Sequence, residues 1–562
     1  MCRKAAEGRT IPICKRVAGL LAVLLAASPA AATVDDRAEL AAYARARAAD
    51  SFGASGQAAR RYASALALSP DNQVLAARAL NQSLVAGDYR VAVQAARILD
   101  RAGRLAPDSR LLLLTDALRN RDWGRANAQV DAIAVDQIYG FMVPILRAWI
   151  ALESGRGDPL VILGASNANP LSVVYAAEQR PFLLLAAGKR REGAVELLKL
   201  TEKSGGRALR LRIAGAATLA RKDREAAAEL LAGDSAPLRS ARALLASRKR
   251  IPGEIAGARA GIAEFLVRVA VDLHGQNATA LAIAHARLST FLAPENSETW
   301  LVTSDLLAAQ DKNADALAAL ANVAADDPFA ANATDSRSKL LVALGDKQAA
   351  LAQAEAATAA ASAGTADWVR LGELYLEMDR PEDSARAYAA AIERAKAAPV
   401  SAEPEWTLWL LRGSALEEAD RWPEAKAALE QAYKLAPDQP LVLNYLGYSQ
   451  LERRENLAEA ERLIREASRL RPEDASITDS LGWAHYVRGN IRSAIELLEK
   501  AAAGEPADPA INEHLGDAYF SAGRRFEARY AWEAALLYAD EKDAGRIRAK
   551  IEAGLSPKLA AP

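Results

Sequence analysis

The sequence predicts an all-α fold, an α-solenoid of helix-turn-helix repeats arranged in two sub-arrays. Three observations carry this prediction. A pattern of apolar and small residues recurs about every 34 residues between Ala263 and Asp540, prolines close several of the repeats, and abundant alanine is combined with only 6% aromatic residues. A period of this length is typical of stacked helix pairs, which bury their apolar faces against their neighbours.

Eight repeats are predicted in the carboxy-terminal half, beginning at Ala263, Ser297, Ala331, Thr365, Trp406, Pro440, Ala475 and Pro509. Their spacings are 34, 34, 34, 41, 34, 35 and 34 residues, and the longest contains a predicted loop from Pro399 to Glu405. Positions 4, 7, 8 and 11 of a repeat fall on one stripe of its first helix. Small residues at position 8, and at or next to position 20, let the two helices approach closely.

The rarer residues of the pattern point to a known family. Leucine-glycine pairs begin at Leu371, Leu446, Leu481 and Leu515, and the segment Trp368-Val-Arg-Leu-Gly-Glu-Leu-Tyr375 nearly completes the motif W-x-x-L-G-x-x-Y. The chain therefore resembles the tetratricopeptide repeat family. This resemblance implies a right-handed superhelix with a concave groove that binds proteins or peptides.

The same register extends towards the amino terminus in a weaker form, with repeats predicted to begin at Glu39, Gln73, Pro107, Phe141, Tyr175 and Leu209. Glycine is missing from position 8 there, so residues 33–238 are predicted to form a degenerate helical array. Residues 239–262 are predicted to be a helical connector and residues 263–540 the carboxy-terminal array. Residues 541–562 are expected to form a solvating capping helix and tail, with Asp543 as its cap residue.

The first 32 residues have the pattern of a cleavable export signal. A basic start precedes an apolar stretch from Val17 to Ala27, and Ala30 to Ala32 provide small residues for cleavage before Thr33. Eleven apolar residues are too few to span a bilayer, so we expect export to the periplasm, with no transmembrane segment after cleavage. Association with a membrane through a partner stays open.

The composition argues against several classes of chemistry. Both cysteines, Cys2 and Cys14, lie in the leader, and the chain carries 71 basic and 71 acidic residues. Five of the basic residues and one acidic residue also lie in the leader, so the remaining chain is slightly acidic, which disfavours nucleic acid as a ligand. The four histidines form no metal-binding motif, and catalytic or nucleotide-binding motifs are missing. We therefore expect no enzyme activity, no cofactor and no metal.

A candidate partner-binding surface follows from the flank of the first helices, which lines the groove in the resembling family. In the last three repeats this flank carries Asn444, Tyr448, Asp479, Trp483, Tyr486, Glu513, Asp517 and Phe520. One interpretation is an acidic and aromatic groove that favours a partner segment containing Lys or Arg. The other is that some of the aromatic residues pack against the next repeat.

The leading functional hypothesis is a non-catalytic periplasmic scaffold or adaptor that holds a partner protein or an extended peptide. Within Pro440 to Tyr538, Asn444-Tyr-Leu-Gly-Tyr and Asp479-Ser-Leu-Gly-Trp are similar to envelope proteins of Gram-negative bacteria. One such group is a lipoprotein adaptor that delivers substrates to a carboxy-terminal processing protease, although its lipid-modified cysteine has no counterpart here. A scaffold for envelope or exopolysaccharide assembly is an alternative. A carbohydrate-binding or glycan-processing protein, with Tyr448, Trp483 and Tyr486 as stacking platforms, is another.

Overall fold

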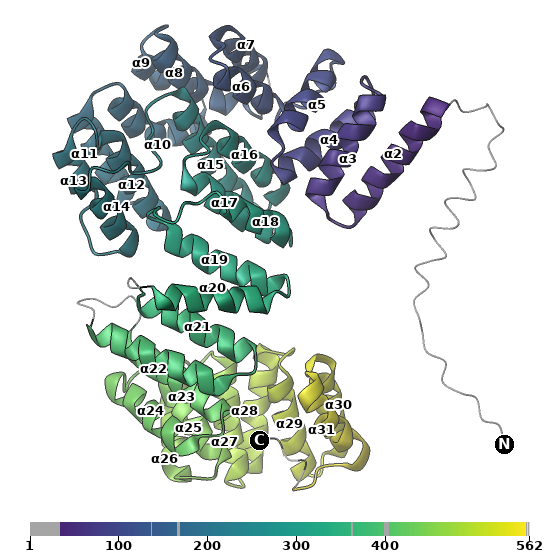
Figure 1. The fold of residues 1–562 in the computed structure, drawn as a ribbon. Coiled ribbons are helices and arrows are strands. Elements are labelled where there is room, and N and C mark those ends of the chain that lie inside the picture. Colours follow the sequence, from purple (N-terminus) through teal and green to yellow (C-terminus); the bar gives the residue numbers. More distant parts are fainter. Residues whose placement is uncertain are drawn as a thin grey trace. The chain divides into compact units, whose positions relative to one another are not determined.

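The computed structural model describes residues 34–135, 138–165, 169–360, 363–397, 404–557, 559 and 561. Within these ranges the chain consists of α-helices joined by short turns, with two short 3-10 helices and no strand (Figure 1). The predicted all-α solenoid is therefore confirmed. The leader expected at residues 1–32 lies outside the described residues. None of the helices in the described part combines the length and the apolar character needed to cross a bilayer.

The chain forms two compact units, of which the first ends at Leu344 and the second begins at Gly345. The helices of the first unit are α2 Val34–Ser51, α3 Ser55–Leu68, α4 Gln73–Ala86, α5 Tyr89–Arg101, α6 Arg110–Arg119, α7 Trp123–Ala134, η1 Gly140–Met142, α8 Val143–Ser154, α9 Pro159–Gly164, α10 Pro170–Ala186, α11 Arg190–Thr201, η3 Gly205–Arg207, α12 Ala208–Leu219, α13 Arg224–Leu230, α14 Ala236–Ala246, α15 Ala258–Gly275, α16 Thr279–Leu292, α17 Ser297–Ala308, α18 Asn313–Leu320 and α19 Ala330–Ala343.

In its described residues, the second unit begins with the single helix α20, continues as five helix pairs and ends with one closing helix. Its helices are α20 Lys347–Ala359, α21 Thr365–Glu377, α22 Pro381–Ala397, α23 Glu405–Glu418, α24 Trp422–Leu435, α25 Pro440–Glu452, α26 Leu457–Leu470, α27 Ala475–Val487, α28 Ile491–Gly504, α29 Pro509–Ser521, α30 Arg525–Tyr538 and α31 Glu541–Ala553. Seven of the eight predicted repeats start within one residue of an observed first helix, and α15 starts five residues before Ala263.

The connector predicted at residues 239–262 lies inside the first unit rather than between two units. Ile251 and Ile255 are buried, and the Ile255 N–H donates a hydrogen bond to Thr218 Oγ1 at 2.9 Å. At the start of α15, the Ala258 N–H donates to Glu153 Oε2 at 2.9 Å. Helix α15 then packs against α6, α8 and α10, and α16 packs against α4 and α6 (Figure 1). These long-range contacts join the first repeats of the predicted second array to the first unit.

The small residues of the repeat pattern have the packing role that the sequence predicts. A Cβ atom at Gly516 would lie 2.4 Å from Cδ1 of Trp532, and one at Gly482 would lie 2.8 Å from Cγ of Leu498. Both distances are shorter than real side chains tolerate, so the close approach of the paired helices requires glycine at these positions. Ala494, at position 20 of its repeat, is fully buried.

Candidate functional site

The first helices of four successive repeats line a pocket in the second unit. Its volume is about 380 Å³, and the lining residues come from α23, α25, α27 and α29 or directly precede α29. They are Glu417, Asn444, Tyr445, Tyr448, Ser449, Glu452, Ser476, Asp479, Ser480, Asp508, Ala510, Ile511 and His514. Three residues of the predicted surface, Asn444, Tyr448 and Asp479, are therefore brought together in one cavity.

The pocket is acidic, and most of its carboxylates already have partners. Glu417 accepts a hydrogen bond from Ser449 Oγ at 2.9 Å and forms an ion pair with Arg453. Asp508 caps α29 by accepting from the Ile511 N–H at 2.9 Å. Glu452 is paired more loosely, at 3.7 Å from Arg453. Burial and the neighbouring charge of Glu417 raise the pKa of Glu452, so this carboxylate would gain from a nearby cation.

Asn444 offers a hydrogen-bond acceptor to the pocket. Its Oδ1 atom is shielded from solvent and has no hydrogen-bond partner among the residues that the structure describes. A buried polar atom without a partner costs free energy, and a donor from a bound chain would remove that cost. Tyr448, four residues further along α25, also lines the pocket, and burial together with the charge of Glu452 raises its pKa.

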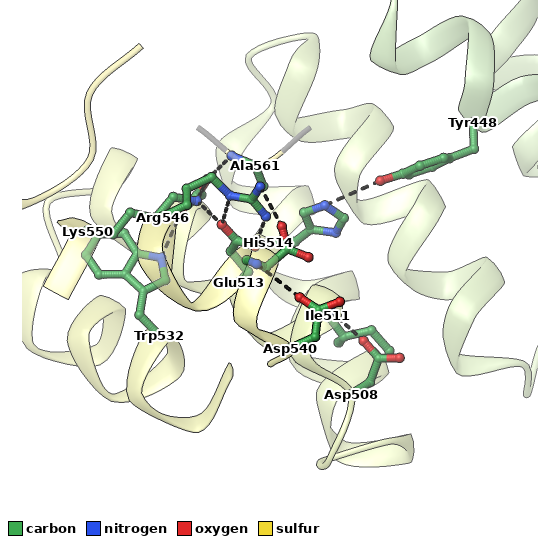
Figure 2. Close-up of polar contacts among 12 residues, drawn as sticks. Tyr448, Asp508, Ile511, Glu513, His514, Trp532, Asp540, Arg546, Lys550 and Ala561 are labelled. Atoms are coloured by element: carbon green, nitrogen blue, oxygen red, sulfur yellow. Dashed lines mark hydrogen bonds and ion pairs between the residues drawn. The ribbon is translucent and has the colours of Figure 1, made fainter. Parts of the chain in front are cut away.

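His514 and Asp479 line the pocket, and Trp483 stacks on His514. His514 Nδ1 lies 2.9 and 3.0 Å from the two carboxylate oxygens of Asp479. His514 Nε2 lies 3.5 Å from Tyr448 Oη (Figure 2). The rings of His514 and Tyr486 stack on Trp483 with centroid distances of 4.1 and 4.5 Å. Burial lowers the pKa of His514, but the charge and hydrogen bond of Asp479 outweigh burial and raise it.

The two acidic residues of α29 belong to a different, closed network. Lys550 of α31 is fully buried, and its Nζ lies 2.6 Å from Glu513 Oε1 and 2.8 Å from both oxygens of Asp517. Arg546 donates two hydrogen bonds of 2.8 Å to Glu513, and Trp532 Nε1 donates to Asp517 at 2.9 Å (Figure 2). The buried carboxylates of Glu513 and Asp517 are thus paired with Arg546 and Lys550, and Arg546 also pairs with Asp543 at 2.8 Å.

Several expectations about the predicted surface are corrected by this arrangement. Glu513 and Asp517 do not present free charge to a basic partner, because Arg546 and Lys550 neutralise them. Trp483 is only 3% exposed, which leaves no ring face for a sugar and confirms the packing interpretation for this residue. Tyr486 is half-buried and its ring stacks on Trp483. Its hydroxyl lies 3.0 Å from Ser521 Oγ. Phe520 lies against Trp532 rather than in the pocket, with ring centroids 5.6 Å apart.

The role of the last helix also differs from the expectation. Asp540, not Asp543, caps α31 by accepting from the Asp543 N–H at 3.0 Å. The helix is more than a solvating cap, because Lys550 enters the interior of the array. The spacing of Arg546 and Lys550, one helical turn apart, was the available signal for this insertion. Glu417, Glu452 and His514 were also missed by the sequence reasoning, since their neighbours come from other repeats.

The tetratricopeptide repeat family model matches residues 369–440, 410–475 and 480–544. A search of curated proteins finds no match to this chain. Among solved structures, MamA from Desulfovibrio magneticus RS-1 is 17% identical, with a TM-score of 0.26 over 31% of this chain and 94% of that one. The tetratricopeptide repeat protein TTC0263 of Thermus thermophilus is 21% identical, with a TM-score of 0.29 over 34% and 98%. A chain of the Cut9–Hcn1 hetero-tetramer is 14% identical, with a TM-score of 0.36 over 93% of this chain and 97% of that one.

Proposed function

We propose that this chain, which matches the tetratricopeptide repeat family model over residues 369–440, 410–475 and 480–544, is a scaffold that binds an extended segment of a partner protein. The segment lies in the pocket between α23 and α29 and carries a Lys or Arg side chain. The scaffold has no catalytic activity of its own. The observation that carries this proposal is the pairing of a loosely neutralised carboxylate, Glu452, with a free acceptor, Asn444, in one cavity.

The chemistry of the pocket matches the chemistry of such a segment. Four carboxylates, from Glu417, Glu452, Asp479 and Asp508, line it, and the only basic group among the lining residues is His514. A cationic side chain near Glu417 and Glu452 would relieve the repulsion between these two groups. A backbone N–H of the same segment can donate to Asn444 Oδ1. Specificity therefore comes from one charge and one main-chain contact, both supplied by α25, with Glu417 of α23 beside the charge.

Synthetic peptides test this proposal directly. Three pools of fluorescent peptides of about ten residues, random apart from a central lysine, glutamate or alanine, are titrated against the full chain and followed by anisotropy. We expect the lysine pool to bind most tightly. The substitution Glu452→Lys should weaken its binding about tenfold or more, because it places a like charge in the pocket.

The matched control is Glu496→Lys, which makes the same charge change on the exposed side of α28. This variant should bind the lysine pool as the unchanged chain does. Equal weakening by both substitutions would assign the effect to net charge and reject the pocket. Equal binding of all three pools would reject the cationic segment itself.

We also propose that the protein works outside the cytoplasm, in the periplasm of a Gram-negative cell. The predicted leader supports this location, and amino-terminal sequencing of the mature chain should give a start at or within a few residues of Thr33. Recovery of chain that still begins at Met1 would contradict export. Delivery of substrates to an envelope protease is the role that the resemblance of residues 440–538 implies. A scaffold for envelope or exopolysaccharide assembly is the alternative, and the identity of a co-purifying partner separates the two.

A further inference from the structure

The segment after α31 turns back onto the array instead of leaving it. This tail comprises residues 554–561, of which 558 and 560 lie outside the described residues. Gly554 has a φ angle of +83°, and a Cβ atom there would lie 2.8 Å from Cζ of Phe520. Both the conformation and the close contact require glycine. Leu555 then packs beside Trp532, and the Leu559 N–H closes a turn by donating to the Ser556 carbonyl at 2.9 Å.

Ala561 of the tail lies against α29. The Ala561 N–H donates a hydrogen bond to Asp517 Oδ2 at 2.8 Å (Figure 2). Its side chain is 7% exposed and belongs to the apolar cluster that contains Leu451, Leu481 and Trp483. Tyr448 and Tyr486 pack against the same cluster. The tail and α31 therefore contact three residues of the predicted binding surface, Glu513, Asp517 and Phe520, and Ala561 shares a cluster with Trp483.

The site that holds Ala561 has the features of a peptide-binding subsite. Asp517 is held by Lys550 and Trp532, and one of its oxygens accepts a backbone N–H that any residue except proline can offer. Ala561 contributes a small side chain, one methyl group, to this apolar cluster. The described contacts of Ala561 amount to one methyl group and one hydrogen bond. An extended segment that uses several repeats can compete with so few contacts by mass action.

We propose that the tail is an intramolecular ligand. The site that holds Ala561 is then a second subsite for an extended partner segment, which would place a small residue where Ala561 lies. The inference rests on the proposed function, because the same segment would reach this subsite from the pocket lined by Tyr448 and His514. In the free protein the tail covers the subsite. Binding of a partner displaces it.

The experiment uses the full chain and a fluorescent peptide with the sequence of residues 555–562, Leu-Ser-Pro-Lys-Leu-Ala-Ala-Pro. The variant Ala561→Asp places a carboxylate beside Asp517, which should expel the tail by like-charge repulsion. Ala561→Ser is the matched control, because serine is small and keeps the backbone donor. We expect Ala561→Asp to bind the peptide about tenfold more tightly than the unchanged chain, since the occupied subsite reduces apparent affinity. Ala561→Ser should bind as the unchanged chain does.

Hydrogen exchange supplies a second readout that does not depend on peptide binding. The Ala561 amide should exchange slowly in the unchanged chain and in Ala561→Ser, and as fast as in an unstructured peptide in Ala561→Asp. Equal peptide affinity in all three chains, or fast exchange in the unchanged chain, would overturn the inference. The lysine pool and Glu452→Lys report on the pocket alone. If they behave as expected while the tail variants have no effect, the proposed function survives and only the intramolecular ligand is rejected.

Discussion

At the scale of single residues, His514 shows how burial and charge compete at this surface. The ring is fully enclosed, which disfavours its protonated form, but Asp479, Asp517 and Glu513 surround it. The charge of Asp479 and its hydrogen bonds to Nδ1 outweigh the cost of burial, so the pKa of His514 is raised. A raised pKa means that the folded state binds this proton more tightly than the unfolded state does.

The pH dependence of stability follows with a definite sign. The contribution of His514 is fully present below its unfolded pKa, near 6.5, and is lost as the pH rises through the higher folded value. We expect His514→Asn to lower the free energy of unfolding of the second unit by about 1–3 kcal/mol at acidic pH. The difference from the unchanged chain should shrink as the pH rises above 6.5. Urea unfolding of both chains at a series of pH values measures this difference in the free energy of unfolding.

The partner variant Asp479→Asn tests the cause of this trend. It removes the carboxylate whose charge and hydrogen bonds raise the pKa of His514 most strongly. In a chain that carries Asp479→Asn, the loss of unfolding free energy caused by His514→Asn should depend much less on pH. A difference that grows as the pH rises would mean that burial outweighs the carboxylates, contrary to the interpretation above.

At the scale of helices, the sequence was a good guide because each repeat carries its own signals. Pro440 and Pro509 stand in the first turns of α25 and α29, where a missing N–H costs nothing, and both helices begin where the repeat register predicts. In the unit beginning at Phe141, Gly155 and Gly157 interrupt the helical pattern, and the second helix, α9, spans only six residues. Local turn chemistry and a fixed period therefore suffice to place helices.

The binding surface was harder to predict, because its properties depend on residues from different repeats. Asn444, Tyr448 and Asp479, which share one flank of the first helices by their position in the repeat, line one pocket. Position in a repeat could not show that Lys550, 33 residues after Asp517, would neutralise that carboxylate. Nor could it show that the tail would cover Trp483. A periodic pattern reports which face a side chain occupies, while the charge partners of Glu513 and Asp517 come from α31, beyond the last predicted repeat.

At the scale of the whole molecule, the first unit departs from a simple solenoid in which each repeat contacts only its neighbours. Its apolar core runs without a break from Ala46 to Leu340. Arg287 of α16 is 3% exposed and donates two hydrogen bonds, of 3.0 and 2.7 Å, to the Val85 carbonyl near the end of α4. Burial lowers the pKa of Arg287 to about 10, which still leaves it charged at neutral pH.

The hydrogen bonds of Arg287 to Val85 allow a test of whether α16 stabilises α4 and α6. Arg287→Met keeps much of the side-chain length but leaves the Val85 carbonyl without its donor, at a cost of about 1–3 kcal/mol. In a simple solenoid the damage would stay within α15 to α18. Because α16 packs against α4 and α6, we expect faster amide exchange in those two helices as well. The control Arg191→Met, at an exposed position, should change neither region. Exchange that rises around α16 while α4 and α6 stay protected would show that the amino-terminal repeats hold their structure without this contact.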